Sequence, residues 1–191
     1  MTILVDKEIR KLLEEKKLII KPPPEPHQIQ PASLDVRLGR EFLFFDKKEI
    51  VLDPLDKNSI LNNSKLVTTD KYIIIEPGEF VLARTLEYIV FPKNIAGYIM
   101  GRSSIGRLGL FVENAGWIDP GFEGTLTLEL VNASSHKIKL YPGMRIAQLI
   151  FFKLSDEPEL GYSERKDSKY KGQILPTISK IFEDLEFKTK K

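Results

Sequence analysis

Apolar and polar residues alternate along much of the chain between residues 33 and 154. In segment 33–39, leucine or valine occupies positions 34, 36 and 38, and polar side chains lie between them. A period of two is typical of β-strands, because successive side chains point to opposite faces of a sheet. We therefore predict strands over residues 33–39, 41–45, 72–76, 79–85, 87–92, 95–100, 124–132, 136–143 and 144–154.

Glycine and proline separate the predicted strands. The pair Pro77-Gly78, for example, lies between two of them and is typical of a turn. Short strands that follow one another at intervals of roughly ten residues favour an all-β fold. We expect a mainly β protein, a barrel or a jelly roll, with one helix at its N-terminal end.

The N-terminal residues have a different pattern. Ile9, Leu12 and Leu13 are spaced as on one face of a helix, which predicts a helix over residues 5–17 that begins near Asp6. Four prolines then occur within residues 22–26. Since proline fixes φ and lacks an amide donor, we expect this stretch to be an extended surface linker.

The C-terminal residues are mostly polar. Residues 161–173 are rich in charge, glycine and serine, which is typical of a mobile segment. Residues 178–191 are compatible with a short amphipathic helix or a strand. We therefore expect one folded domain over residues 1–160 and a flexible C-terminal segment over residues 161–191.

Composition limits the chemistry of the chain. Its 191 residues contain no cysteine and only two histidines, His27 and His136, which are far apart. Disulfides, thiol nucleophiles and cysteine-based zinc sites are excluded, including the site that zinc-dependent nucleobase deaminases need. Any hydrolysis must depend on carboxylates, hydroxyls, arginines, backbone dipoles or a divalent ion held by oxygen atoms.

Charge and hydropathy limit the partners and the location. The formal net charge is +2, which predicts no polyanion-coating surface, so nucleic acid is not the expected main partner. The chain has no apolar run of about 18 residues that would span a membrane. Its N-terminal residues lack the apolar core and cleavage site of a signal peptide. We expect a cytoplasmic protein.

The first candidate for a binding site is a serine-arginine motif. Arg102, Ser103, Ser104 and Arg107 follow a predicted strand. One interpretation is an anion site, in which turn amides and two arginines contact a phosphate. The other is a helix with a serine N-cap and solvated arginines. The motif lacks the residue order of a Walker loop, and the local sequence leaves both interpretations open.

Two carboxylates follow within the next residues. Asp119 precedes Pro-Gly, where one interpretation is that it caps the turn. The other is a functional role, in which it accepts a hydrogen bond from a sugar hydroxyl or orients a water or a metal-bound phosphate. Glu129 lies in a predicted strand whose alternating leucines face the core. Glutamate is unfavourable there, and burial in a pocket would raise its pKa to a range useful for proton transfer. A solvated strand glutamate is the alternative.

Four further polar residues have weaker patterns. Gln148 lies in an otherwise apolar strand, where its amide either pairs with the backbone or reads the edge of a ligand. Tyr162, Lys169 and Gln173 lie in the polar C-terminal segment and are ordinary loop residues when taken alone.

Taken in order, these motifs resemble those of the dCTP deaminase family, within the trimeric dUTPase superfamily. The resemblance implies a distorted jelly-roll β-barrel of the dUTPase type, a homotrimer with active sites between subunits, and Mg²⁺ bound mainly through the nucleotide phosphates rather than zinc. It covers residues 3–175 approximately, through the motifs RSSIGR, AGWIDPGFEG, LTLELVN, GMRIAQL and YSERKDSKYKGQ, with SLDVRLG and PGEFVLART as further matches.

The resemblance also implies roles for individual residues. Glu129 corresponds to the general acid and base, with Asp119, Ser103 and Arg107 beside it in catalysis. The C-terminal segment corresponds to a lid that closes over the triphosphate. Contacts to the nucleotide are implied for Arg102, Ser103, Ser104, Ile105, Gly106, Arg107, Asp119, Thr127, Leu128, Glu129, Gln148, Tyr162, Lys169 and Gln173.

The implied reaction is hydrolysis of the 4-amino group of dCTP to dUTP and ammonia. After Ala115, purely deaminating members carry His-Arg, whereas Gly116-Trp117 resembles bifunctional members that continue to dUMP and diphosphate, and so supply dUMP for dTTP synthesis. The loop from Arg107 to Asp119 is shorter than in typical deaminases. A dUTP diphosphatase without deaminase activity is therefore an alternative, although it needs no glutamate at the position of Glu129. A non-catalytic nucleotide-binding module is a third hypothesis.

Overall fold

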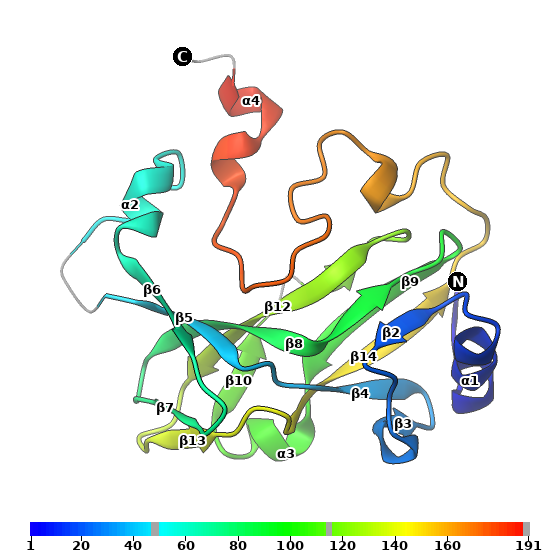
Figure 1. Cartoon of the computed structure of the whole chain (residues 1–191), viewed down its shortest axis with the longest axis horizontal. Coiled ribbons are helices and arrows are strands. Elements are labelled where there is room, and N and C mark those ends of the chain that lie inside the picture. Colours follow the sequence, from blue (N-terminus) through cyan, green and yellow to red (C-terminus); the bar gives the residue numbers. More distant parts are fainter. Residues whose placement is uncertain (47–49, 114–115, 189–191) are drawn as a thin grey trace.

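Two antiparallel sheets face each other and form the body of the protein (Figure 1). The computed structural model describes residues 1–46, 50–113 and 116–188. In spatial order, the first sheet contains β11 (Trp117–Ile118), β9 (Ile95–Gly101), β14 (Arg145–Lys153), β4 (Ser33–Arg37) and β3 (Ile29–Gln30), with β1 (Thr2–Ile3) paired to β14. The second contains β10 (Leu110–Glu113), β12 (Glu123–Asn132), β8 (Phe80–Val90), β5 (Glu41–Phe45) and β6 (Ser64–Thr68), with β2 (Ile19–Lys21) paired to β8. A separate pair joins β7 (Ile73–Ile75) to β13 (Ile138–Leu140).

The hydrophobic core lies between the two sheets. Leu34 and Val36 of β4, Phe151 of β14 and Leu128 of β12 are all fully buried in one cluster. Burying a side chain of this size contributes about 1.5–3 kcal/mol, so the alternating apolar positions determine which face of each strand turns inward. The predicted mainly β fold is confirmed. Among the described strands, hydrogen bonds do not close the two sheets into one continuous barrel.

The predicted strand boundaries are wrong in one region. Residues 79–85 and 87–92 were expected to be two strands, but β8 runs without interruption from Phe80 to Val90. Thr85 explains the difference, because its Oγ1 donates to the carbonyl oxygen of Glu87 at 2.8 Å and accepts the amide of Leu126 at 2.9 Å. The irregularity in the β8–β12 register is thus bridged by a side chain. Shorter strands such as β6, β10 and β11 were not predicted.

Only the centre of the segment 18–31 is the surface linker that was expected, because Pro22, Pro23, Glu25 and Pro26 are exposed. Its flanking residues form β2 and β3, and a short 3-10 helix, η1 (Pro26–Gln28), lies between them. Ile20 is buried, and the Gln28 side chain is completely buried and donates to the Asp35 carbonyl oxygen at 2.8 Å. Prolines break the helix as expected, but the residues around them pair with the sheets and complete the core.

Short helices cover the edges of the sheets. The predicted N-terminal helix is confirmed as α1 (Asp6–Glu14), which buries Ile9 completely. Asp56 caps α2 (Lys57–Leu61) by accepting the amide of Asn58 at 2.9 Å. The other helices are α3 (Ser103–Gly106), η2 (Tyr162–Glu164), η3 (Ile181–Glu183) and α4 (Leu185–Lys188). None of the helices in the described ranges is long and apolar enough to cross a membrane.

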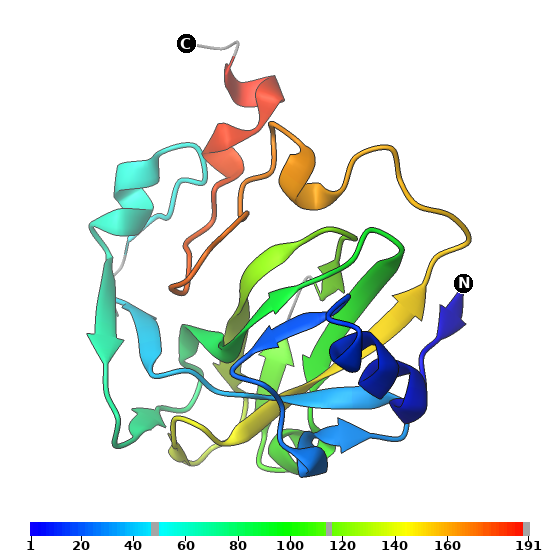
Figure 2. The same ribbon diagram turned by 45° about the vertical axis from the view of Figure 1, so that its right-hand side comes forward.

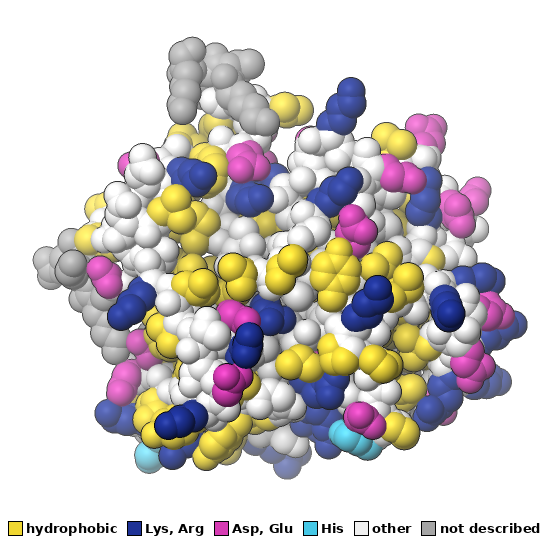
Figure 3. Space-filling model, viewed as in Figure 1, with side chains coloured by type: hydrophobic (Ala, Val, Ile, Leu, Met, Phe, Trp, Pro, Cys, Tyr) yellow, Lys and Arg dark blue, Asp and Glu magenta, His cyan; other side chains and the backbone are white. Residues whose placement is uncertain are grey.

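The C-terminal segment packs against the sheets and α2. Figures 1 and 2 show it descending between α2 and the ends of β8 and β12. Gln173 forms a parallel bridge with Gly124, and its carbonyl oxygen accepts the amide of Thr125 at 2.9 Å. Ile178 is buried in a second apolar cluster with Leu43, Ile60 and Leu82. Despite its polar composition, the C-terminal segment is therefore held against the rest of the protein by a few specific contacts. In Figure 3, a band of apolar side chains crosses the middle of the molecule beneath this segment.

Candidate functional site

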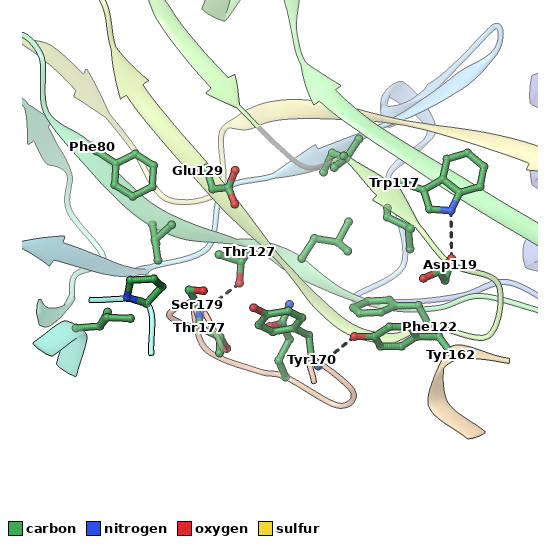
Figure 4. Close-up of a pocket in the computed structure, with 18 of the residues that line it drawn as sticks. Phe80, Trp117, Asp119, Phe122, Thr127, Glu129, Tyr162, Tyr170, Thr177 and Ser179 are labelled. Carbon is green, nitrogen blue, oxygen red and sulfur yellow. Dashed lines mark hydrogen bonds between the residues drawn. The ribbon is translucent and has the colours of Figure 1, made fainter. Parts of the chain in front are cut away.

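A cavity of about 520 Å³ lies between the two sheets and the C-terminal segment (Figure 4). Its volume is within the usual range for a small-molecule site. One part of the wall is apolar and comes from β5, the α2 region and β8, through Phe45, Leu52, Pro54, Ile60, Phe80 and Leu82. The other part carries polar groups from β12, the turn before it and the C-terminal segment, through Asp119, Thr127, Glu129, Tyr162, Tyr170, Gln173, Thr177 and Ser179.

Strand β12 turns Glu129 and Thr127 into this cavity. Leu128 and Leu130 are buried on the opposite face of the strand, which confirms the predicted alternation for this part of β12. Leu126 differs, because it lies at the register irregularity between Thr125 and Thr127 and also lines the cavity. Figure 4 shows the Glu129 carboxylate above the Thr127 hydroxyl, on the same side of the strand. A carboxylate at this place can accept a proton from a water molecule that enters the cavity.

Asp119 lies at the other end of the polar wall. Its carbonyl oxygen accepts the amide of Phe122 at 3.2 Å and so closes the Pro-Gly turn. Its Oδ1 accepts the indole Nε1–H of Trp117 at 3.1 Å, as Figure 4 shows. The backbone of Asp119 therefore closes the turn, while its side chain lines the cavity.

Gly116 is located where two strands come very close. Its carbonyl oxygen accepts the amide of Ile99 at 2.9 Å, and a Cβ at this position would lie 2.5 Å from the Ile99 carbonyl oxygen. The adjacent Trp117 stacks on Phe152, with ring centroids 5.9 Å apart. Asn114 and Ala115, which precede Gly116, lie outside the described residues. Close packing of β9 and β11 thus accounts for glycine at position 116.

We predict that Gly116→Ala destabilises the protein by about 1–3 kcal/mol, because the added methyl group must displace a backbone carbonyl. Thermal unfolding monitored by circular dichroism measures this change. Gly106→Ala is the matched control, since its Cβ would meet no atom within 4 Å and it lies in α3. The control should be neutral or slightly stabilising. Equal melting temperatures for Gly116→Ala and wild type would contradict the steric argument.

The C-terminal segment contributes aromatic and amide groups. The Tyr162 ring packs against Phe122 at 5.7 Å, and its hydroxyl oxygen accepts the amide of Tyr170 at 3.1 Å. Burial raises the pKa of Tyr162, so its hydroxyl stays protonated. The Gln173 side chain donates to the Thr125 carbonyl oxygen at 2.7 Å. These contacts place Tyr162 and Gln173 in the wall of the cavity.

Lys169 belongs to the same segment but does not line the cavity. Its Nζ donates to Asp184 Oδ1 at 2.5 Å, and this hydrogen bond is the main reason that the pKa of Lys169 is raised. The ammonium group therefore remains charged and is held within the C-terminal segment, away from Glu129.

The serine-arginine motif lies away from the cavity. Figure 1 shows α3 at the end of the molecule opposite the C-terminal segment. Ser103, Ser104 and Arg107 are exposed, whereas the Ile105 side chain is buried in the core and fixes the short helix. Arg102 occupies the N-cap position and makes no side-chain capping bond, so the expectation of a serine N-cap is wrong. Within one copy of the chain, these residues do not meet Glu129.

Gln148 also lies outside the cavity. It belongs to β14 and is paired in register with Met100 of β9 and Asp35 of β4. Its side chain lies on the face of the first sheet that is turned away from the core, between the exposed Met100 and the buried Asp35. The structure thus separates the predicted residues that line the cavity from those near α3 and Asp35, while Leu128 and Lys169 belong to neither group.

Sequence patterns did not indicate several walls of the cavity. Phe80 begins a long strand, Leu52 and Pro54 precede α2, and Thr177 and Ser179 follow the C-terminal motif YSERKDSKYKGQ. None of them has a local pattern that differs from ordinary core or loop residues. Tyr170 had a weak signal, because it lies between two residues of the recognised C-terminal motif, Lys169 and Gln173.

A family model described as dCTP deaminase-like matches residues 3–154. The chain belongs to this family. It is 48% identical to the dUMP-forming dCTP deaminase of Persephonella marina, over 95% of this chain and 98% of the relative. It is 44% identical to the dUMP-forming dCTP deaminase of Aquifex aeolicus, over 98% of this chain and 99% of the relative.

A solved member of the family has a similar fold. The crystal structure of 2'-deoxycytidine 5'-triphosphate deaminase from Agrobacterium tumefaciens superimposes with a TM-score of 0.62 at 29% identity. The similarity covers 78% of this chain and 47% of that longer chain. The chain therefore resembles this family in sequence over residues 3–154 and one solved dCTP deaminase in fold over 78% of its length.

Proposed function

We propose that this protein is a dCTP deaminase of the dUMP-forming type. The observation that carries the proposal is Glu129, a carboxylate that a core strand turns into a nucleotide-sized cavity, with Asp119 in the same wall. Curated relatives named as dUMP-forming dCTP deaminases, 44% to 48% identical over nearly the whole chain, support the assignment. The chain contains no cysteine, so deamination must proceed without the cysteine-bound zinc of other nucleobase deaminases.

Glu129 would act twice during deamination. As a water oxygen attacks C4 of cytosine, the carboxylate takes the proton of that water, and it then returns the proton to the leaving amino group. The products are dUTP and ammonia. Backbone groups of Thr127 and Leu128 would hold the base beside Glu129, and Asp119 would contact the deoxyribose and a second water. Attack of that water on the phosphate chain would yield dUMP and diphosphate.

A complete site would require a second copy of the chain. Arg102, Ser103, Ser104 and Arg107 are exposed or partly exposed at α3, on the part of the molecule remote from the cavity. The first sheet also presents exposed apolar side chains, including Tyr98, Met100 and Trp117. Such a face is suited to subunit contact. We infer a homotrimer in which the serine-arginine motif of one copy reaches the Glu129 cavity of its neighbour.

The C-terminal segment and Mg²⁺ complete the proposal. Residues 161–188 would form the lid of the domain that ends near residue 160, with Tyr162 and Gln173 facing the nucleotide. Lys169 would have to leave Asp184 to contact the phosphates. In the described ranges, no group of three or more Asp, Glu or His side chains could hold a metal by itself. Mg²⁺ would be bound mainly through the nucleotide phosphates, where it would neutralise charge on the triphosphate.

Incubation of the pure protein with dCTP and Mg²⁺ tests the proposed function. Ammonia is measured enzymatically and nucleotides are separated by chromatography. Release of ammonia together with dUMP and diphosphate is the expected result. Ammonia with dUTP as the final product would support deamination but contradict the proposed cleavage to dUMP and diphosphate. Cleavage of dUTP without turnover of dCTP would contradict the deaminase assignment, and no turnover of either would indicate a binding module.

A further inference from the structure

Asp35 is a buried carboxylate beside the serine-arginine motif. Its side chain is only 3% exposed, although it lies on the face of β4 that is turned away from the core. Arg102 Nε lies 3.1 Å from Asp35 Oδ2, and Arg145 Nη1 lies 3.0 Å from the same oxygen. One carboxylate therefore holds two guanidinium groups at the beginning of α3.

The surrounding hydrogen bonds fix this arrangement. Arg102 Nη1 donates to the Arg145 carbonyl oxygen at 3.2 Å, and Arg145 Nη1 also donates to the His27 carbonyl oxygen at 3.0 Å. The backbone of Asp35 is held in turn, because Gln28 Nε2 donates to its carbonyl oxygen at 2.8 Å. Arg102 is thus bound through two of its nitrogens, while 24% of its side chain remains exposed.

This arrangement reduces two free-energy costs of binding an anion. A free arginine loses rotamer entropy when a ligand immobilises it, and two adjacent guanidinium groups repel each other. A buried carboxylate between them removes both costs before the ligand arrives. Its negative charge also repels phosphate. If orientation of Arg102 matters more, removal of the charge weakens phosphate binding; if this repulsion matters more, removal strengthens it.

We propose that Asp35 is a positioning residue, which orients Arg102 for contact with the phosphate chain of the nucleotide. The proposal rests on the proposed function, since that function assigns Arg102 to the triphosphate. Asp35 acts through Arg102 and does not take part in proton transfer. Its removal should therefore weaken binding of the phosphate chain more than it slows deamination of the bound nucleotide.

Asp35→Asn tests the proposal, because it keeps the shape of the side chain and removes its charge. We expect the KM for dCTP to rise about tenfold while kcat changes less than about threefold. Calorimetric binding of inorganic tripolyphosphate should weaken by a similar factor, and this measurement does not depend on activity. Unchanged or tighter tripolyphosphate binding would overturn the proposal, as would failure of the wild-type protein to bind tripolyphosphate.

Glu87→Gln is the matched control. Glu87 is another fully buried carboxylate, and its arginine partner is Arg37, whose Nε lies 2.7 Å from Glu87 Oε1. It is joined to Asp35 through Gln28, whose Nε2 donates both to the Asp35 carbonyl oxygen and to Glu87 Oε1. It should lower stability without raising the KM, and an equal rise in KM would count against a specific role for Asp35. If Asp35→Asn does not fold, Asp35→Glu moves the carboxylate by one methylene, and a normal KM in that variant would reject the proposal.

Two measurements separate this inference from the proposed function. Absence of ammonia release by the wild-type protein would contradict the deaminase assignment. Normal ammonia release by the wild type, together with an unaltered KM in Asp35→Asn, would contradict only the role of Asp35.

Discussion

Glu129→Gln is expected to lower the rate of ammonia release from dCTP by about 10²–10⁴-fold, which is the usual contribution of general acid-base catalysis. Glutamine has nearly the same volume, so the cavity wall keeps its shape. It cannot accept the proton of the attacking water or return a proton to the leaving ammonia. The loss should therefore be in kcat, while the nucleotide still binds.

Steady-state kinetics and calorimetric titration with dCTP check the two parts of this prediction separately. Glu123→Gln is the control, because Glu123 belongs to the same strand, β12, but does not line the cavity. The control should retain most of the wild-type activity. An active Glu129→Gln protein would refute the assigned role, and a variant that no longer binds dCTP would point to a binding role instead.

Mixing two inactive variants is expected to restore activity. Arg107→Ala removes a group near α3, and Glu129→Gln removes the carboxylate in the cavity. If each site takes one group from each of two neighbouring copies, every mixed trimer has both intact groups in about one third of its sites. Neither variant alone forms an intact site, so ammonia release by the mixed trimers should rise from a very low level to about one third of the wild-type rate.

Co-expression of the two variants with different affinity tags, followed by tandem purification, provides the mixed assemblies. Each variant purified alone is the control. A protein that carries both substitutions, mixed with the wild type, provides a second control for subunit exchange. Mixed assemblies that stay inactive would contradict a shared site, and a monomeric mass in solution would contradict the proposed trimer itself.

Local sequence patterns were sufficient for the part of the site that depends on one strand. In β12, alternating leucines required the side chains between them to face the other way, and Glu129 was placed correctly for that reason. The mainly β architecture followed from the same period of two. Burial of apolar side chains dominates the free energy of folding here, and the buried positions recur regularly along consecutive residues.

Patterns failed where the relevant contacts join distant residues. Thr85 bridges an irregular register by bonding to Leu126, and this contact keeps β8 continuous where two strands were expected. Gln28 is buried because it bonds to Asp35 and Glu87, although it follows a run of prolines. Neither the Thr85 contact nor the burial of Gln28 produces a periodic pattern in the sequence. The apolar wall of the cavity was missed because its residues come from separate segments and are ordinary in each.

The separation of the site into two groups was also beyond local reasoning. The family resemblance implied contacts from both α3 and the C-terminal segment, and it implied sites between subunits. The structure places these groups at opposite ends of one copy. Physical rules for helices and strands do not predict which surface residues face another copy, because that depends on the shape of the whole molecule.

The close approach at Gly116 has an evolutionary consequence. A side chain at this position meets the Ile99 carbonyl oxygen, so a larger residue at position 116 requires a second change that moves β11 away from β9. Residue 116 is therefore expected to vary only together with its neighbours, and libraries of single variants at this position should contain mainly unstable proteins.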